Sequence, residues 1–353
     1  MSHGSAEPAL DPLPRSGQDD LMEKPARKKR DGRQAVTSSV TSDREEGLLV
    51  RAAWLAYVGD LTQAQIAKSL GLTRLRVNRM LAHARQRGIV QIRINSKVAN
   101  CIELENRLRD AYGVSDPIVV PTPPDPTLVP QVIAAAAGEA LSHRIRDGIS
   151  VGVGWGRTLQ LSLRSVTVRP VRGMSVVSLL GGLTRGSAIN IYEIASRLAA
   201  LFDAECFYIA APVFTDTEAT RDLLMRQSIL EDAFTHARDV DAAFVSVGAV
   251  HKDATIFRIG LVGDDDLRSL REAGAVGDIC GHWIGADGQL VDHPLNSRVI
   301  GLAPEHLRDI DTVILPSGGL DKVPVLRAVL RLGVVDVLIT DEKTAEAILA
   351  EKL

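Results

Sequence analysis

The chain has 353 residues, of which 45% are hydrophobic and 24% charged, and its formal net charge is −3. This length allows two domains with a sizeable core, and the composition is that of an ordinary globular protein. The three cysteines are isolated and form no CxxC pair, which argues against a disulfide framework and a structural zinc site. Without a signal-peptide core or a membrane-length apolar run, we expect a cytoplasmic protein with no membrane partner.

Residues 1–44 are rich in Pro, Ser, Gly, Asp and Arg and lack apolar periodicity, which predicts a disordered tail. A first helix is predicted from about Glu46, because apolar residues recur at helical spacing from there to Gly59. This helix is expected to pack beneath the helices that follow it. A first domain is therefore predicted over residues 45–97.

Residues 62–87 predict two short helices joined by a tight turn. Thr62 is a suitable N-cap, and Gln65 stands three residues later, as in a capping box. Gly71 is the expected turn residue, because glycine adopts a positive φ at little steric cost. Thr73 is expected to cap the second helix, which is heavily basic.

The spacing from Ala67 to Gly71 to Val77 is that of a helix-turn-helix. A small residue lets the two helices approach, the glycine permits the turn, and Val77 anchors the second helix on the first. In the DNA-binding version of this motif, the second helix lies in the major groove and reads bases with its N-terminal side chains. The side chains expected to face DNA are those of Thr73, Arg74, Leu75, Arg76, Asn78 and Arg79.

An ordinary helical hairpin with a solvated basic face is the alternative, and the charge distribution favours DNA binding. Between residues 47 and 95 there are eight basic residues and a single acidic one, Asp60, whereas the rest of the chain is net acidic. A small basic module beside a large acidic body indicates a local phosphate-binding surface. Aromatic residues make up 4% of the chain, which disfavours binding by stacking on bases.

Two further elements are predicted near the domain boundary. Residues 89–94 alternate apolar and polar side chains, which predicts a strand behind the second helix, a wing that offers Gln91 and Arg93 to the DNA backbone. Residues 98–114 predict an amphipathic linker helix between the two domains. This helix is also a candidate for pairing with its counterpart in a second subunit.

From residue 115 to 353, short apolar segments alternate with amphipathic ones, which predicts an α/β domain. Such alternation is typical of a doubly wound, mostly parallel sheet that helices cover on both faces. Ligands of such sheets bind beyond the carboxyl ends of the strands. Strands are predicted at 118–120, 149–153, 174–180, 206–210, 242–248, 312–315 and 335–339, with helices at 128–146, from 157, and at 189–202, 217–237, 264–274, 321–332 and 342–351.

Three glycine-rich loops, at 152–158, 180–186 and 316–322, follow predicted strands and lead towards helices. Backbone N–H groups in such loops approach anions closely, and a helix N-terminus adds positive potential. The first loop matches neither a Walker motif nor GxGxxG, and each loop alone has a plain turn as its alternative. Together they predict a site for a small anionic or polyhydroxylated ligand, formed by Gly154, Trp155, Gly156, Thr158, Gly181, Gly182, Arg185, Asn190 and Lys322.

The segment 277–288 leaves several assignments open. Asp278 either accepts hydrogen bonds from ligand hydroxyl groups, which we favour, or caps a helix. Asp287 and Gly288 predict the turn of a hairpin. His282, Trp283 and His293 either line a pocket or pack in the interior, and packing is the commoner role for such side chains.

The helix-turn-helix and the segments GVGWGRTL, LLGGLTRG, AVGDICG and LPSGGLDKVPVLRAVLRLGVVDVLITDE resemble the SorC family of bacterial sugar-responsive transcription regulators, over about residues 45–350. The resemblance implies a C-terminal domain, 115–353, that is similar to sugar-phosphate isomerases and binds a phosphorylated sugar. It also implies a homo-oligomer, a dimer or tetramer. On this resemblance, residues 154–158 and Lys322 hold the phosphate, while Asn190 and Asp278 read the sugar hydroxyls.

Two residues depart from the family pattern. Thr158 is a single hydroxyl residue in a loop where some members have two threonines, and Trp155 stands in the same loop. Asp278 stands where some relatives have glutamate. A free sugar or sugar alcohol therefore stays open as the effector beside a sugar phosphate.

The sequence thus predicts a DNA-binding regulator, a repressor of a carbohydrate or polyol catabolic operon, with no cofactor. Two recognition helices would read successive major grooves of a pseudo-palindromic operator, with Arg74 and Arg79 on guanine, Asn78 on adenine and Leu75 on a thymine methyl group. The alternatives are a sugar-phosphate isomerase or deaminase with a DNA-binding domain, and an architectural DNA binder without a ligand. The absence of a carboxylate after the strand 174–180 argues against the enzyme.

Overall fold

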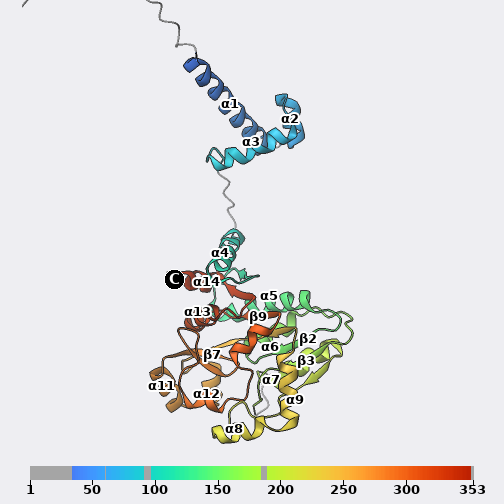
Figure 1. Ribbon diagram of the computed structural model, residues 1–353, viewed down its shortest axis with the longest axis vertical. Coiled ribbons are helices and arrows are strands. Elements are labelled where there is room, and N and C mark those ends of the chain that lie inside the picture. Colours follow the sequence, from blue (N-terminus) through green and yellow to red (C-terminus); the bar gives the residue numbers. More distant parts are fainter. Residues whose placement is uncertain (1–33, 60, 91–96, 184–188, 351–353) are drawn as a thin grey trace, which may run out of the picture. The chain divides into compact units, whose positions relative to one another are not determined.

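The computed structural model describes residues 34–59, 61–90, 97–183 and 189–350 (Figure 1). The chain divides into two compact units, 1–93 and 94–353, each of which is described by itself. Within the described ranges, no helix is both long and apolar enough to cross a bilayer. Most of the predicted wing strand at 89–94, with Gln91 and Arg93, lies outside the described residues.

The small unit consists of α1 (Gln34–Tyr57), α2 (Gln63–Leu70) and α3 (Arg74–Gln86). The predicted capping box is confirmed, because the Gln65 backbone N–H donates to the Thr62 hydroxyl and the Gln65 side chain accepts from the Thr62 N–H. Gly71 ends α2 with φ 65°, as the turn requires. The helix-turn-helix is therefore present with the predicted caps.

Small side chains bring the three helices together. Ala52 and Ala53 of α1 are buried beside Ala67 of α2, and Val77 of α3 is fully buried among them. Burying an apolar side chain of this size stabilises a fold by about 1.5–3 kcal/mol. Val77 therefore fixes α3 on the other two helices, as its spacing predicted.

The first helix extends further towards the N-terminus than predicted. α1 begins at Gln34, well before the expected start near residue 45. From residue 34 to 46 the sequence contains neither glycine nor proline, so nothing interrupts propagation of the helix from its packed second half. Residues 1–33 lie outside the described part of the chain.

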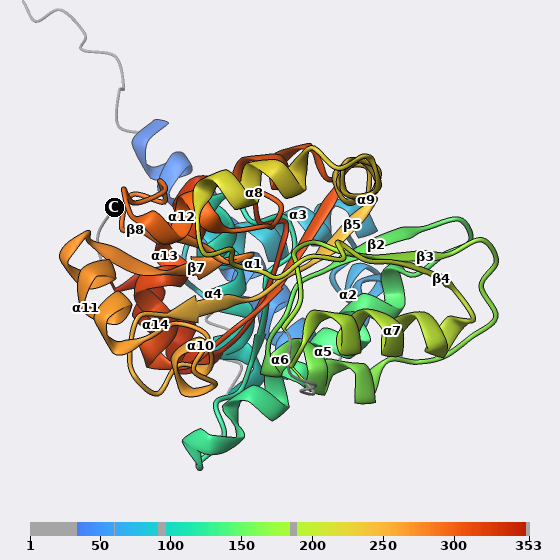
Figure 2. The ribbon, with the colours of Figure 1, turned by 90° about the horizontal axis from the view of Figure 1, so that it is seen from below.

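The large unit is built on a parallel seven-stranded sheet, which confirms the predicted fold class (Figure 2). Its strand order is β1-β10-β9-β5-β2-β3-β4, and every neighbouring pair runs parallel. The chain moves from β2 outward to β4 and then returns to β5 on the other side of β2. The strand order therefore reverses between β2 and β5. The strands are β1 (Ile118–Val120), β2 (Ser150–Val153), β3 (Ser175–Ser178), β4 (Glu205–Phe207), β5 (Ala242–Phe244), β9 (Thr312–Pro316) and β10 (Val337–Asp341).

Helices cover both faces of this sheet. In Figure 2, α5 and α7 lie along one face and α9 along the other. The single helix predicted at 217–237 is instead α8 and α9, separated at Gln227, which has extended backbone angles. The helices are α4 (Lys97–Tyr112), α5 (Val129–Arg144), α6 (Arg157–Ser162), α7 (Ile191–Phe202), α8 (Glu218–Met225), α9 (Ser228–Arg238), α10 (Thr255–Arg258), α11 (Asp264–Glu272), α12 (Pro294–Arg298), α13 (Val323–Leu332) and α14 (Glu342–Leu349), with short 3-10 turns at Pro126–Leu128, Leu163–Ser165, Pro304–Asp309 and Leu320–Lys322.

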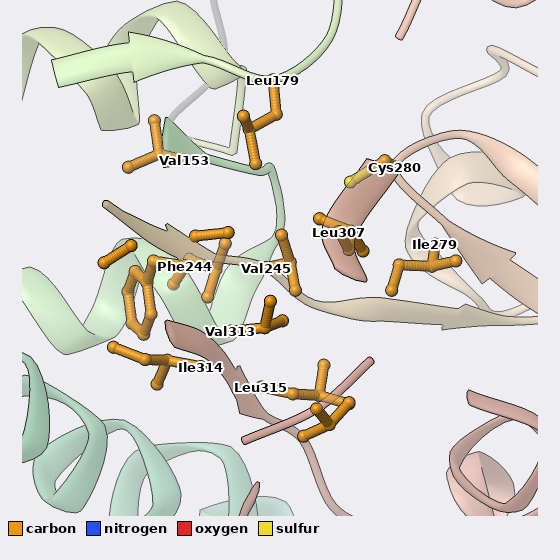
Figure 3. Close-up of a cluster of buried hydrophobic side chains, with 14 of the residues drawn as sticks. Val153, Leu179, Phe244, Val245, Ile279, Cys280, Leu307, Val313, Ile314 and Leu315 are labelled. Atoms are coloured by element: carbon orange, nitrogen blue, oxygen red, sulfur yellow. The ribbon is translucent and has the colours of Figure 1, made fainter. Parts of the chain in front are cut away.

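The central strands are buried on both faces. Figure 3 shows Phe244 of β5 beside Ile314 of β9, with Val313 and Leu315 on the same strand, and all four side chains are fully buried. Such strands read as continuous apolar runs, because both of their faces meet helices. This core holds the carboxyl ends of β2, β5 and β9 in fixed positions.

A second, antiparallel sheet of three strands was not predicted. It consists of β6 (Val247–Ala249), β7 (Ala275–Ile279) and β8 (His282–Gly285). The single strand predicted at 242–248 is wrong, because the chain leaves the parallel sheet after Phe244 and enters this second sheet at Val247. Asp278 lies within β7, so the helix-cap alternative for it is also wrong.

The hairpin turn predicted at Asp287 and Gly288 is confirmed. Gly288 has φ 82°, and Leu290 forms an antiparallel bridge with Ile284 of β8. Trp283 is fully buried, and its ring lies 5.7 Å from that of Phe257, centroid to centroid. His282 and His293 are buried too, so all three of these aromatic side chains pack in the interior.

The predicted linker helix belongs to the large unit. Leu104 and Leu108 of α4 are buried in the core of that unit, and Glu105 accepts a hydrogen bond from the Val119 N–H at 2.9 Å. Asn100 donates to Glu342 of α14 at 2.5 Å. This helix is therefore packed as part of the large unit.

Candidate functional site

A cavity of about 210 Å³ lies where the strand order reverses. The loops that follow β2, β5 and β9 line it, together with the last turn before α7, one residue of β7 and the short helix α10. This is the position at which open parallel sheets bind ligands. The cavity is smaller than the roughly 300–1,000 Å³ typical of sites for drug-sized ligands, so it suits a small metabolite.

The first predicted loop lines the cavity with Trp155, Gly156 and Thr158. Gly156 has φ 128°, and a Cβ atom there would lie 2.7 Å from Ser246 Oγ. The Ser246 hydroxyl donates to the Trp155 carbonyl at 2.6 Å, which fixes the loop against the end of β5. Gly154 is buried behind the lining, where its N–H donates to the Phe244 carbonyl at 2.8 Å.

The third predicted loop, after β9, brings Lys322 to the cavity. Gly319 of this loop has φ 101°, and its N–H donates to Thr344 Oγ1 at 2.8 Å. Thr344 in turn donates to Asp341, a buried carboxylate at the end of β10. Lys322 Nζ donates to the Val247 carbonyl at 3.0 Å, so the ammonium group is held at the start of β6.

Asp278 reaches the cavity from β7, and its side chain is 3% exposed. Gly248 lies opposite in the β6–β7 register, and a Cβ atom there would overlap the Asp278 carboxylate. Asp278 Oδ2 accepts a hydrogen bond from the Gly281 N–H at 3.3 Å. Gly248 therefore provides the space that the carboxylate occupies.

Burial shifts the pKa of both charged groups deep in the cavity. Burial raises the pKa of Asp278 to about 6, although the nearby Lys322 ammonium opposes the rise. Burial also lowers the pKa of Lys322, against the opposing effects of Asp321 and Asp278. Asp278 is thus ionised at neutral pH and available as a hydrogen-bond acceptor.

The second predicted loop contributes less than expected. Asn190 does not line the cavity, because its Oδ1 accepts from the Tyr192 N–H at the start of α7 and its amide bonds the Leu183 backbone. Gly181 and Gly182 are buried, and a Cβ atom on Gly182 would overlap the Tyr192 ring. Arg185 lies outside the described residues.

Sequence reasoning missed several contributors to the cavity, among them Arg157, Ile256 and Ile259. Arg157, the first residue of α6, lines it directly after the predicted glycines. Ile256 and Ile259, in and after α10, form an apolar side of the wall. A helix of four residues is too short for a periodic signal, whereas Arg157 could have been found from its place at the loop–helix junction.

The predicted DNA-reading side chains occupy the outer face of α3. Thr73, Arg74, Asn78 and Arg79 are exposed, and so is Leu75 with 61% of its surface accessible. The Thr73 hydroxyl accepts from the Arg76 N–H at 3.3 Å, which caps the helix. The structure thus brings all six predicted residues to one exposed helix end.

Comparison with known proteins then identifies the family. The family model described as "Putative sugar-binding domain" matches residues 96–350. The erythritol catabolism regulatory protein EryD of Brucella abortus is 32% identical over 88% of this chain and 98% of its own length. The deoxyribonucleoside regulator of Bacillus subtilis is 31% identical over 87% of this chain and 98% of its own length.

A solved structure has a similar fold over most of this chain. The full-length sorbitol operon regulator SorC of Klebsiella pneumoniae covers 87% of this chain and 99% of its own, with a TM-score of 0.67 and 24% identity. This chain is a member of the SorC family of sugar-binding transcriptional regulators. EryD and the deoxyribonucleoside regulator are both named as regulators, which supports a transcription regulator over the enzyme alternative.

Proposed function

We propose that this SorC-family regulator binds a small polyhydroxylated effector, a sugar, polyol or sugar phosphate, in the cavity at the strand-order reversal. Asp278 supports this assignment most directly, because it is a buried carboxylate with one hydrogen bond from protein among the described residues. A carboxylate has about four acceptor positions, so Asp278 retains capacity for ligand hydroxyl groups. The name of EryD, a regulator of erythritol catabolism, is consistent with such a ligand.

The remaining groups of the cavity fit the other parts of such a molecule. The hydroxyl of Thr158 and the side chains of Arg157 and Lys322 are donors for hydroxyl or phosphate oxygens. Trp155 and Ile256 offer apolar surface to the C–H groups of a carbon chain or ring. The effector would thus lie with hydroxyls on Asp278 and its C–H face on the apolar wall.

DNA binding is assigned to α3. Arg74 and Arg79 would contact guanine, Asn78 adenine and Leu75 a thymine methyl group, with Thr73 and Arg76 near the backbone. A homo-oligomer, dimer or tetramer, would place two α3 helices in successive major grooves of a pseudo-palindromic operator. Effector binding would weaken this complex, so that the protein represses a sugar or polyol catabolic operon until the effector appears.

A two-step experiment tests the proposal. The full-length chain selects a duplex from a random DNA library, and its thermal stability is then measured with C4–C6 polyols, sugars and their phosphates. We expect at least one compound to raise the melting temperature and to weaken binding of the selected duplex. Asp278→Asn should reduce both effects, whereas Asp265→Asn, at an exposed carboxylate on α11, should not.

Two outcomes would contradict the proposal. If no compound stabilises the wild-type chain, the cavity is not a site for this class of ligand. If a compound stabilises the wild type and Asp278→Asn equally, the ligand binds elsewhere or Asp278 does not read it.

A further inference from the structure

Helix α1 carries a row of exposed apolar side chains that the small unit does not cover. Val50, Trp54, Tyr57 and Val58 are 46%, 57%, 40% and 67% exposed. Leu49 and the alanines that pack on α2 and α3 lie on the other side of the same helix. We call this exposed row, with Gly47 at its N-terminal end, the α1 stripe.

The spacing of the α1 stripe is that of a two-helix seam. Gly47, Val50, Trp54 and Tyr57 follow one another at intervals of three, four and three residues, as the inward positions of a coiled coil do. A Cβ atom on Gly47 would meet nothing within 4 Å, so the stripe is open at this end. The helix itself continues from there back to Gln34, which extends the length available to a partner helix.

Charged residues on the two edges of the stripe favour a second α1 helix, in parallel orientation, as its partner. Glu46 precedes the stripe on one edge and Arg51 lies on the other, and both are exposed. In a parallel pair of helices, these two positions face each other across the seam, which brings Glu46 to Arg51 of the partner subunit. An antiparallel pair in which Gly47 opposes Tyr57 would instead bring Arg51 close to Arg51 of the partner subunit and would leave Glu46 without an arginine across the seam.

We propose that the α1 stripe packs in parallel against the α1 stripe of a second copy of this chain, and so pairs the two α3 helices. Glu46 already accepts from Arg87 of its own chain at 3.3 Å, and a carboxylate has room for a second guanidinium. The inference that this contact pairs the two α3 helices rests on the proposed function, whereas the contact between the two α1 stripes does not.

The size of the stripe defines what the contact does. Its exposed side chains would bury about 350 Å² per copy, given the area of aromatic and valine side chains. A stable interface of standard size needs about 800 Å² per partner. The α1 contact is therefore too small to hold two copies together by itself, and it orients copies that DNA or another contact has brought together. It is tested by the proximity of the two α1 helices and not by the oligomeric state of the chain.

Disulfide formation in the full-length chain tests the contact and its direction. Gly47→Cys places a thiol on the seam, where a parallel pair sets it against the same residue of the partner. Glu45→Cys, an exposed position off the seam, is the matched control. We expect Gly47→Cys to form a disulfide-linked dimer about tenfold faster than Glu45→Cys, and Trp54→Glu in the Gly47→Cys background to remove that advantage.

Charge reversal tests the edges. Arg51→Glu in the Gly47→Cys background should slow cross-linking, because it sets two glutamates against each other, and Glu46→Lys added to it should restore the rate. Equal rates for Gly47→Cys and Glu45→Cys would overturn the contact. Cross-linking that requires Gly47→Cys on one copy and Tyr57→Cys on the other would overturn the parallel direction, since an antiparallel pair opposes these positions.

The experiments distinguish failure of the α1 contact from failure of the proposed function. A chain that binds its selected duplex and responds to an effector, but does not cross-link at Gly47→Cys, refutes the α1 contact alone. A chain that cross-links at this position and binds no DNA refutes the proposed function and leaves the contact standing. Protection of Trp54 from quenching in a strictly monomeric sample would mean that the large unit covers the stripe, which overturns the proposal.

Discussion

The two units of this regulator assemble their functional surfaces in opposite ways. In the small unit, the predicted DNA-reading residues from Thr73 to Arg79 are contiguous, and one helix presents them all. In the large unit, Thr158, Asp278 and Lys322 come from three segments that only the fold of the two sheets brings together. A local surface tolerates changes elsewhere in the chain, whereas an assembled cavity depends on each close approach between segments.

The largest expected effect is at the cavity. Gly248→Ala adds a Cβ atom that overlaps the Asp278 carboxylate, so the carboxylate must move from its place. We expect effector affinity to fall about a hundredfold, nearly 3 kcal/mol, while affinity for the selected duplex stays unchanged. Isothermal titration with the active compound measures the loss. Gly263→Ala, where the new Cβ atom meets no atom closer than 3.8 Å, is the matched control.

A second prediction concerns pH and stability. Burial raises the pKa of Asp278 to about 6 in the folded chain, above its ordinary value of 3.8. Its contribution to stability is therefore complete below about pH 4 and is lost as the pH rises through 6. Asp278→Asn should raise the free energy of unfolding by up to about 3 kcal/mol at pH 7.5 and by about 1 kcal/mol at pH 4.5. Urea unfolding at both pH values checks this, and a gain independent of pH would refute it.

The third prediction tests the local surface. Arg79→Ala removes an exposed guanidinium from α3, and we expect it to weaken binding of the selected duplex by about 1–3 kcal/mol and to relax preference at one base pair. Fluorescence anisotropy at fixed salt measures the affinity, and repeated selection measures the preference. Arg85→Ala, also exposed on α3 but near its C-terminal end, should leave the base preference unchanged. An unchanged affinity for Arg79→Ala would exclude it as a contact.

The smallest expected effect is at the turn of the helix-turn-helix. Gly71 has φ 65° and open space around its Cβ position, so alanine there meets backbone strain but no neighbour. We expect Gly71→Ala to destabilise the small unit by about 1 kcal/mol. Thermal unfolding followed on that unit measures the change, and effector binding by the large unit should be unaltered. A destabilisation of the large unit as well would contradict a strain confined to this turn.

The same comparison explains what could be predicted from sequence. The small unit was predictable because its signals are local: the cap at Thr62, the glycine at the turn and the inward Val77 lie within one short stretch. In the large unit, apolar segments predicted most strands. The break after Phe244, where the chain leaves one sheet for another, has no signal of its own in the sequence.

Those parts of the cavity that have a local signal in the sequence were predicted, and the others were not. Gly156 and Lys322 are in glycine-rich loops that follow strands, and such loops can be recognised from sequence. Asn190 is in a similar place, but its amide bonds the backbone of its own loop, a use that sequence cannot distinguish from ligand binding. Ile256 could not be found, since its helix has four residues and its role depends on the fold.

The central claim is that a ligand in the cavity of the large unit controls DNA binding by the small unit. Fluorescence anisotropy of the selected duplex, titrated with the stabilising compound, tests it most directly on wild type and Gly248→Ala. We expect the compound to weaken duplex binding by the wild type about tenfold, the size of a typical coupling between two sites, and to leave Gly248→Ala unaffected. A wild-type chain that binds the compound without any change in duplex affinity would contradict the account.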